Sequence, residues 1–342
     1  MGVIRPVSTE EFLQLEHPIL DVRSPAEHQR GHIPGSIAFP LFSDEERAVV
    51  GTAYKQQGRD QAVLEGLRLI GPRMAPMVEQ ARRSAPGLKV RIHCWRGGER
   101  SGSVAWLLDK AGFNEVFTLK GGYKQFRSHV LSSFERPWDL RVLGGYTGTG
   151  KTGILKALHA QGEQVIDLEA IAHHKGSAFG ALGQPPQPTT EHFEALLWNE
   201  LRKADGTKPI WVEDESLMIG TVRIPEGFFA RMRSAHLFFM ELPLEIRAHR
   251  LVSEYGVFSK EELGLSIQRI GKRLGPQHVK AALEALADGD LLSVALITLR
   301  YYDKAYLRGI TERDPSMISR MSIDTDSHRT ASILREQIST HV

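Results

Sequence analysis

Short apolar runs alternate with longer helical patterns along the first part of the chain. Residues 18–23, 89–93 and 115–119 predict strands, because each is a brief stretch of branched or aromatic residues close to a turn signal. Residues 43–83 have a largely helical pattern. Strands that alternate with helices form parallel sheets with helices on both faces, and functional loops lie at the carboxyl ends of such strands. We therefore predict an α/β fold whose site follows a strand.

The second part of the chain repeats this alternation and then becomes helical. Residues 140–143 predict a strand, and helical patterns dominate from Glu245 onward. The junction at residues 132–138 contains a proline but no low-complexity linker. The predicted domains are residues 1–137 and residues 138–342, the second an α/β domain with a helical C-terminal part.

Composition restricts the class of protein. The 342 residues are 41% hydrophobic and 25% charged, with one cysteine and a net charge of +2. These values are typical of a globular protein in a reducing compartment, and one cysteine cannot form a disulfide within the chain. The N-terminus lacks the apolar core of a signal peptide, and no apolar run reaches the roughly 18 residues of a membrane span. We expect a cytoplasmic protein with no membrane partner, and a nucleic-acid partner would need a local basic patch.

The one cysteine lies in a seven-residue segment between a predicted strand and a helical pattern. The first N–H groups of a helix have no intrahelical partner, so these groups and the helix dipole favour a thiolate at this position. A buried structural cysteine is the common alternative, but two glycines and two arginines in the segment favour a reactive thiol. The predicted catalytic residues are Cys94, Arg96 and Arg100, in a loop completed by Gly97 and Gly98.

A second anion-binding motif follows the strand at residues 140–143. The next segment matches the spacing G-x4-G-K-[ST] and continues into a helical pattern, which is the strand–loop–helix context of a P-loop. Glycines let backbone N–H groups face a diphosphate, lysine neutralises the anion, and a threonine hydroxyl can bind Mg²⁺. The predicted phosphate-binding residues are Gly145, Gly148, Gly150, Lys151 and Thr152.

Carboxylates follow two further predicted strands, where P-loop enzymes keep the acid that orients a metal. Asp167 and Glu169 end one strand, and Glu213, Asp214 and Glu215 end the next. A solvated acidic turn is the alternative, and the position after an apolar strand favours function. We select Asp167, Glu213 and Asp214 as supporting or metal-orienting residues, without a firm metal site.

Basic residues in the helix-rich part have the spacing of helix faces that hold phosphates and bases. An ordinary solvated helix face is an equally good interpretation of the same charges. The residues concerned are Arg247, Arg250, Arg269, Lys272 and Arg273.

Four motifs in the first domain resemble a rhodanese domain over roughly residues 5–136. They are Asp21–Arg23, Gly31–Ser36, the Cys94 loop and Leu119–Tyr123, in the expected order. The resemblance implies that the cysteine carries a transferable sulfur or selenium atom. The C-x5-R spacing is longer than in small rhodaneses and is shared with cysteine-dependent phosphatases, so it suits a phosphate-sized anion. A phosphatase is therefore an alternative, although no obvious carboxylic acid for the leaving group is present.

The order of the two domains, together with residues 167–180 and 212–216, resembles bacterial tRNA 2-selenouridine synthases. The resemblance implies that 2-thiouridine at the wobble position, in the anticodon arm of tRNA, becomes 2-selenouridine. It also implies selenophosphate from a supply enzyme as selenium donor, and an S-geranylated intermediate made from geranyl diphosphate. We assign geranyl diphosphate to the P-loop and selenium to the Cys94 loop. Selenium can reach the base as a Cys94 perselenide or by direct attack of selenophosphate.

Two other classes of protein fit parts of this pattern. A rhodanese-fused kinase that uses ATP would explain the P-loop, although no acceptor site is recognisable. A sulfur-relay or RNA-binding adaptor without enzymatic activity would explain the basic helices.

Overall fold

Two compact units make up the chain. A computed structural model describes residues 3–311 and 313–339, and the chain divides after Ser133 into unit 1 (residues 1–133) and unit 2 (residues 134–342). Phe134 belongs to unit 2 because its ring is buried and packs edge-on against Phe228, with ring centroids 6.4 Å apart. The structural division thus precedes the predicted boundary, which follows Pro137.

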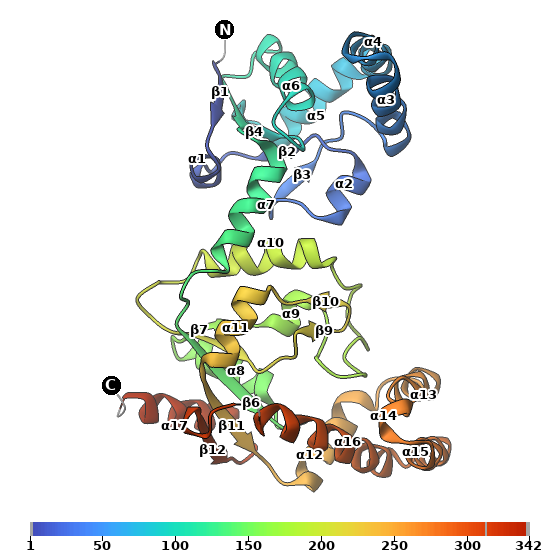
Figure 1. The fold of residues 1–342 in the computed structure, drawn as a ribbon, viewed down its shortest axis with the longest axis vertical. Coiled ribbons are helices and arrows are strands. Elements are labelled where there is room, and N and C mark those ends of the chain that lie inside the picture. The colour runs from blue at the N-terminus through green and yellow to red at the C-terminus, as the bar shows by residue number, and fades with distance from the viewer. Residues whose placement is uncertain (1–2, 312, 340–342) are drawn as a thin grey trace. The chain divides into compact units, whose positions relative to one another are not determined.

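Unit 1 contains a five-stranded parallel sheet with the order β1-β5-β4-β2-β3 (Figure 1). Val90, Ile92 and Val116 are buried in this sheet and pack in one core with Val104 and Leu108 of a covering helix. The α/β class predicted for this part is confirmed. The strands are β1 (Val3–Val7), β2 (Ile19–Asp21), β3 (Ser36–Ala38), β4 (Lys89–His93) and β5 (Glu115–Leu119).

Serine residues start several helices of unit 1. The hydroxyl oxygen of Ser8 accepts the N–H of Glu11, and that of Ser43 accepts the N–H of Glu46, so each satisfies a donor that the helix leaves unpaired. The helical elements are α1 (Thr9–Gln14), α2 (Pro25–Arg30), α3 (Asp44–Gln57), α4 (Arg59–Ile70), η1 (Gly71–Arg73), α5 (Met74–Ser84), α6 (Glu99–Lys110) and α7 (Gly122–Ser133).

Unit 2 contains a second five-stranded parallel sheet, with the order β12-β11-β6-β8-β7. The chain runs from the central strand β6 to one side of the sheet and later to the other, so the loop after β6 lies where ligands bind in open α/β sheets. The strands are β6 (Leu140–Gly145), β7 (Gln164–Ile166), β8 (Ile210–Glu213), β11 (His236–Glu241) and β12 (Ile318–Ser322), with a separate hairpin of β9 (Met218–Ile219) and β10 (Val222–Arg223).

The helices of unit 2 include a cluster with its own small core, formed where Leu263, Ile267, Leu286 and Val294 pack together. This is the helical part predicted after Glu245 (Figure 1). The helical elements are α8 (Lys151–Ala160), α9 (Leu168–Ala172), α10 (Thr190–Leu201), α11 (Glu226–Ser234), α12 (Leu244–Tyr255), α13 (Lys260–Arg269), α14 (Gly271–Leu274), α15 (Pro276–Asp288), α16 (Leu291–Thr311), η2 (Pro315–Met317) and α17 (Ser327–Ser339). Among the described residues, none of these helices is both long and apolar enough to cross a membrane.

Candidate active site

The Cys94 loop joins β4 to α6 at the carboxyl edge of the unit 1 sheet. A Cβ atom added to Gly122 would lie 2.4 Å from the carbonyl oxygen of Cys94, so the loop rests directly on the first glycine of α7. The N–H of Tyr123 donates to the same carbonyl oxygen over 2.8 Å. The segment that follows β5 therefore holds the loop in place.

The Cys94 thiol is buried, with 3% of the residue exposed, and its Sγ lies 3.2 Å from Oγ of Ser101 in the first turn of α6. Burial by itself raises the pKa of this thiol. The Ser101 hydroxyl and the N–H groups of Ser101, Arg96 and Gly98 outweigh burial and lower the pKa below its usual value. Ser101 was missed by sequence reasoning, because a serine in a first helical turn is common and carries no special signal.

The two arginines of the loop differ in their surroundings. The Arg100 guanidinium donates to the Glu27 carboxylate over 2.6 and 3.2 Å, and Glu27 in turn accepts the N–H of Ser24. Arg96 is exposed beside the loop. The thiolate is therefore stabilised by the hydroxyl and N–H groups, while the charge of Arg100 is matched by Glu27.

A buried polar network lies at the carboxyl end of β2 and β4. The Arg23 guanidinium is 2.6 Å from the Asp21 carboxylate, both side chains are fully buried, and the guanidinium carbon lies 3.7 Å from the centroid of the Tyr123 ring. Burial lowers the pKa of His93 to about 4, so this residue is neutral at pH 7. The rhodanese-like motif at residues 21–23 thus supports Tyr123, which holds the Cys94 loop.

The P-loop of unit 2 joins β6 to α8. Gly148 and Gly150 both have φ of +83°, a conformation that favours glycine. A Cβ atom on Gly148 would lie 3.0 Å from the carbonyl oxygen of Arg247, and one on Gly150 would overlap the Arg250 guanidinium. The glycines predicted from the motif therefore allow α12 to pack against the loop.

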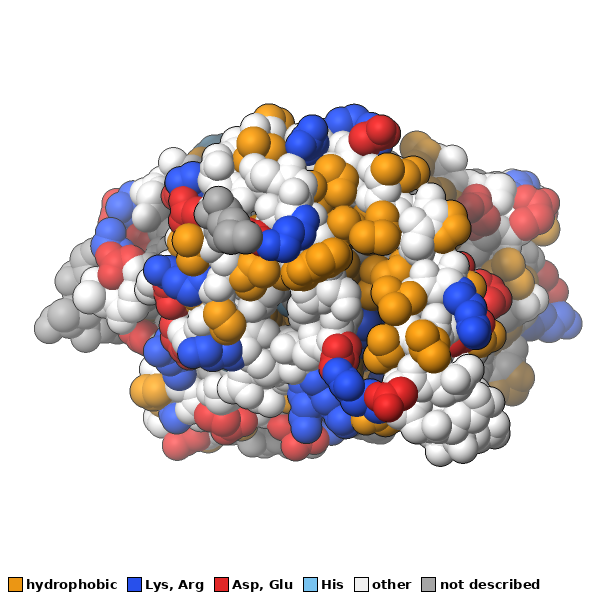
Figure 2. All heavy atoms as spheres, turned by 90° about the horizontal axis from the view of Figure 1, so that it is seen from above, with side chains coloured by type: hydrophobic (Ala, Val, Ile, Leu, Met, Phe, Trp, Pro, Cys, Tyr) orange, Lys and Arg blue, Asp and Glu red, His pale blue; other side chains and the backbone are white. Residues whose placement is uncertain are grey.

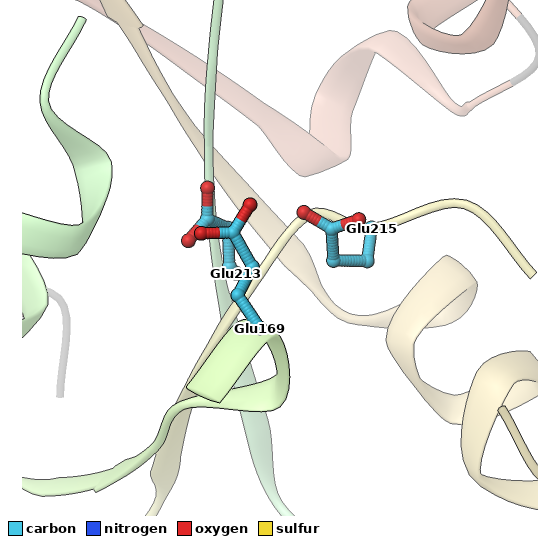
Figure 3. Close-up of side chains that lie close together, drawn as sticks. All are labelled: Glu169, Glu213 and Glu215. Carbon is cyan, nitrogen blue, oxygen red and sulfur yellow. The ribbon is translucent and has the colours of Figure 1, made fainter. Parts of the chain in front are cut away.

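Lys151 and three glutamates meet behind the P-loop. Lys151 is buried, its Nζ lies 3.3 Å from Oε1 of Glu213, and it donates to the carbonyl oxygen of Gly145 over 3.2 Å. Carboxylate oxygens of Glu169, Glu213 and Glu215 lie within 4.8 Å of one another, and the three carboxyl groups face a common point (Figure 3). This arrangement of oxygen ligands is suited to a divalent cation.

Buried charge shifts the protonation of this cluster. Burial, together with the charge of Glu213, raises the pKa of Glu169 to about 8. Burial and the neighbouring carboxylates also raise the pKa of Glu215 well above its usual value. Burial alone would lower the pKa of Lys151, but Tyr306 and the glutamates outweigh it and raise the pKa. The lysine stays charged, and the glutamates share protons when nothing else is bound.

A polar pocket of about 120 Å³ opens over the P-loop. Its wall includes Lys175, Gly176 and Ser177, from the segment between α9 and α10. A Cβ atom on Gly176 would lie 2.8 Å from Oε1 of Glu215, so glycine lets this segment lie on the carboxylates. Thr147, Ser177, Leu251, Tyr255 and Tyr302 also line an adjoining apolar pocket.

Asp214 has a structural role, so its assignment as a metal-orienting residue is corrected, whereas Asp167 supports the site because it caps the helix that carries Glu169. Asp167 caps α9, because its Oδ1 accepts the N–H of Ala170 over 2.8 Å. Asp214 pairs with Arg313 over 2.8 Å, since residues 213 and 215 point to one side of an extended chain and 214 points to the other. Besides Glu213, the site contains Glu169 and Glu215, and continuing the alternation of β8 past its end at Glu213 could have identified Glu215.

The basic residues predicted to contact phosphates fall into two groups. Arg247 is buried, and its guanidinium donates to the Asp303 carboxylate and to the carbonyl oxygen of Thr147, which contradicts its assignment as a surface contact. Arg250 donates to the carbonyl oxygen of Thr149 and lines the P-loop pocket. The remaining three are exposed on α13 and α14, namely Arg269, Lys272 and Arg273.

Removing the Asp214 carboxylate should weaken the fold and leave the chemistry largely intact. Asp214→Ala leaves the buried Arg313 charge without its partner, which costs roughly 3 kcal/mol of the free energy of unfolding. Chemical denaturation measures this loss, with Asp288→Ala, an exposed aspartate, as the matched control. Loss of activity at unchanged stability would restore Asp214 as a site residue.

Ser101→Ala should raise the pKa of the Cys94 thiol, because a hydrogen bond that favours the thiolate is removed. Absorbance of the thiolate near 240 nm, followed against pH with Cys94→Ser as the blank, measures the titration, since Cys94 is the only cysteine. Ser103→Ala, on an exposed position of the same helix, should leave the midpoint unchanged. An unchanged midpoint in Ser101→Ala would show that Ser101 does not stabilise the thiolate.

Comparison with known protein families gives a match for each of the two domains. A model of the tRNA 2-selenouridine synthase AAA domain matches residues 138–337, and a model of the rhodanese-like domain matches residues 8–129. The rhodanese resemblance and the P-loop domain predicted from the sequence are therefore confirmed.

Curated relatives extend this match to nearly the whole chain. The tRNA 2-selenouridine synthase of Shewanella woodyi is 33% identical, covering 94% of this chain and 95% of the relative. The synthase of Shewanella piezotolerans is 34% identical, covering 89% and 92%. The synthase of Bdellovibrio bacteriovorus is 38% identical, covering 74% and 68%. The chain belongs to the tRNA 2-selenouridine synthase family, whose members are enzymes that modify tRNA.

Proposed function

We propose that the protein replaces sulfur by selenium at C2 of a wobble 2-thiouridine in the anticodon arm of tRNA, in two steps. Geranyl diphosphate first alkylates the sulfur, and selenophosphate then supplies selenium. The observation that carries this proposal is the pair of pockets in unit 2, because the polar P-loop pocket shares a wall with an apolar one. Family membership argues against an adaptor without enzymatic activity.

The apolar lining of this pocket, whose volume is about 50 Å³, supports a prenyl diphosphate rather than a nucleotide as the P-loop ligand, and a ten-carbon chain must displace lining side chains to enter it. Beyond the shared wall, it is lined by Leu263, Leu291, Val294 and Ala295 of the helical cluster. A ten-carbon chain attached to a diphosphate has the same two parts, an apolar body and a doubly charged head. A nucleotide base and ribose would need several hydrogen-bond partners there, and burying their polar groups without partners is costly.

In the first step the P-loop stabilises the departing diphosphate. The C2 sulfur forms a bond to C1 of the geranyl chain, the C1–O bond breaks, and N3 of the uracil ring releases its proton. Backbone N–H groups of the loop and the buried Lys151 ammonium face the diphosphate as its negative charge grows. Alkylation converts the thiocarbonyl into a thioether, whose sulfur leaves more readily as a thiol.

The three glutamates fit a Mg²⁺ ion that accompanies the diphosphate. Oε2 of Glu213 is buried without a hydrogen-bond partner among the described residues, and Thr152 Oγ1 lies 3.4 Å from Oε2 of Glu169. Glu169, Glu213, Glu215 and Thr152 would hold the ion, whose charge would neutralise the carboxylates and the diphosphate. The carboxylates lose their shared protons when such a cation is bound.

In the second step the Cys94 loop holds selenophosphate. Selenium forms a bond to C2, the C2–S bond breaks, and geranylthiol leaves with a proton. The P–Se bond then breaks as the buried Cys94 thiolate accepts the phosphoryl group, and N3 regains a proton as the C2 selenocarbonyl forms. Water then releases the phosphoryl group from Cys94 as inorganic phosphate. This route changes no oxidation state, whereas a Cys94 perselenide would need a two-electron oxidant, so we favour direct attack.

The exposed basic residues of α13 and α14 are proposed contacts for the phosphates of the anticodon arm. Arg269, Lys272 and Arg273 lie on neighbouring turns of the helical cluster. Selenophosphate itself has to come from an enzyme that phosphorylates selenide, which makes such a supply enzyme the second proposed partner.

Substitution of the two anion sites should separate the two steps. Cys94→Ser keeps geranylation of thiolated tRNA and loses selenation at least ~100-fold, whereas Lys151→Met loses geranylation, because the diphosphate then lacks its buried counter-charge. Mass spectrometry of nucleosides from tRNA incubated with both donors measures each product. Full selenation by Cys94→Ser, or normal geranylation by Lys151→Met, would contradict the assignment of the two loops.

A polar group in the apolar pocket should weaken binding of geranyl diphosphate and leave inorganic diphosphate unaffected. Leu291→Asn lowers the affinity for geranyl diphosphate about tenfold, because Leu291 lines the apolar pocket and not the polar one. Calorimetric titration measures both ligands, and Leu265→Asn, at an exposed leucine outside the pocket, is the control. Tighter binding of ATP than of geranyl diphosphate to the unmodified protein would favour the kinase alternative.

A further inference from the structure

Unit 1 has an apolar groove next to the Cys94 loop. The groove has a volume of about 550 Å³, within the roughly 300–1,000 Å³ range of small-molecule sites. It runs between α4 and α6, and its wall includes Leu67, Ile70, Met74, Trp106, Leu107 and Gly98.

The apolar wall of the groove faces solvent. Leu67 is 54% exposed and Trp106 is 52% exposed, although both are large hydrophobic residues on well-formed helices. Figure 2 looks down on unit 1 from the top of Figure 1, where α4 and α6 lie, and hydrophobic side chains gather in a patch on this face. An exposed apolar patch of this kind marks a surface that a ligand or partner covers.

The charged residues at the groove, including Glu99 in its wall, are paired with one another. Glu99 at the start of α6 accepts hydrogen bonds from Arg59 at the start of α4 over 2.8 and 3.2 Å, and Arg100 is bound by Glu27. A charged peptide would have to compete with these pairs. An uncharged hydrocarbon chain needs no ionic partner, so it fits the groove as it stands.

The groove is continuous with the candidate site, because Gly97 and Gly98 of the Cys94 loop line it. The N–H of Gly98 is one of the groups that lower the pKa of the Cys94 thiol. An occupant of the groove therefore lies against the loop that binds the anion. Of the reactants at this loop in the proposed function, selenophosphate is a small anion, and the alkylated nucleoside carries a ten-carbon apolar chain.

We propose that the groove binds the geranyl chain of the S-geranylated nucleoside during the selenation step. This inference rests on the proposed function and adds a second prenyl-binding site, separate from the pocket beside the P-loop. The bound chain places C2 of the nucleoside at the Cys94 loop, and it keeps the sulfur directed away as the C2–S bond breaks and geranylthiol forms.

Filling the groove tests the proposal. Gly102 lines the groove, and a Cβ atom added to it would meet nothing within 4 Å. The leucine side chain of Gly102→Leu therefore occupies the groove without disturbing the core. Leucine also has a higher helix propensity than glycine. Ser128→Leu, on an exposed position of α7 outside the groove, is the matched control. The substrate is tRNA alkylated chemically with geranyl bromide, so the assay does not depend on the first step.

The expected result is a rise of at least ~10-fold in KM for geranylated tRNA in Gly102→Leu, with geranylation of thiolated tRNA unchanged and Ser128→Leu normal. Each buried CH₂ contributes about a fourfold change in affinity. The full-length unmodified protein should therefore also prefer a geranyl over a five-carbon dimethylallyl chain at least ~10-fold, and Gly102→Leu should lose this preference.

Two outcomes would overturn the inference while the proposed function stands. In the first, Gly102→Leu has an unchanged KM for geranylated tRNA, and the protein without substitutions selenates geranylated and dimethylallylated tRNA equally well. The other is a defect in Gly102→Leu that appears only with a second protein present, which would assign the groove to a protein partner. If the unmodified protein selenates no geranylated tRNA at all, the proposed function fails instead.

Discussion

Behind the P-loop of unit 2, carboxyl groups outnumber buried ammonium groups, and this imbalance of charge constrains what the site can bind. A single buried ammonium group, that of Lys151, faces the carboxyl groups of Glu169, Glu213 and Glu215. Three carboxylates cannot all be ionised at such short distances in a poorly solvated place, so protons remain on them, as the pKa of about 8 for Glu169 indicates. A diphosphate alone would add to the repulsion. The loop and the glutamates are therefore suited to an anion that is accompanied by a cation.

The Cys94 loop and the P-loop have the same position between a strand and a helix, and they differ in the groups that hold them in place. Each loop lies between a parallel strand and the start of a helix, where N–H groups are unpaired. The Cys94 loop rests on backbone groups that follow β5, whereas the P-loop rests on two arginines of α12. The first support is uncharged and leaves a low-pKa thiol in the loop. The second is cationic and suits a more highly charged ligand.

Much of this arrangement could be predicted from the sequence, because it depends on local geometry. The alternation of strands and helices predicted both sheets, and the glycines of the P-loop are required by φ values that few other residues adopt. Long-range partners could not be predicted in the same way. The burial of Arg247 depends on Asp303, which lies on another helix, and the role of Ser101 depends on how α6 is oriented toward Cys94. Asp214 was misassigned because three consecutive acids were considered without the alternation of an extended chain.

The close contact of Gly122 with the Cys94 loop has a consequence for how related chains can be interpreted. Any side chain at that position would collide with the carbonyl oxygen of Cys94 and with the amide nitrogens of Gly97 and Arg96. A homologous chain could therefore retain the cysteine and both arginines and still lack a formed anion loop if this glycine is replaced. Inspection of the position of Gly122 is thus a sharper criterion for a formed Cys94 loop than inspection of the cysteine.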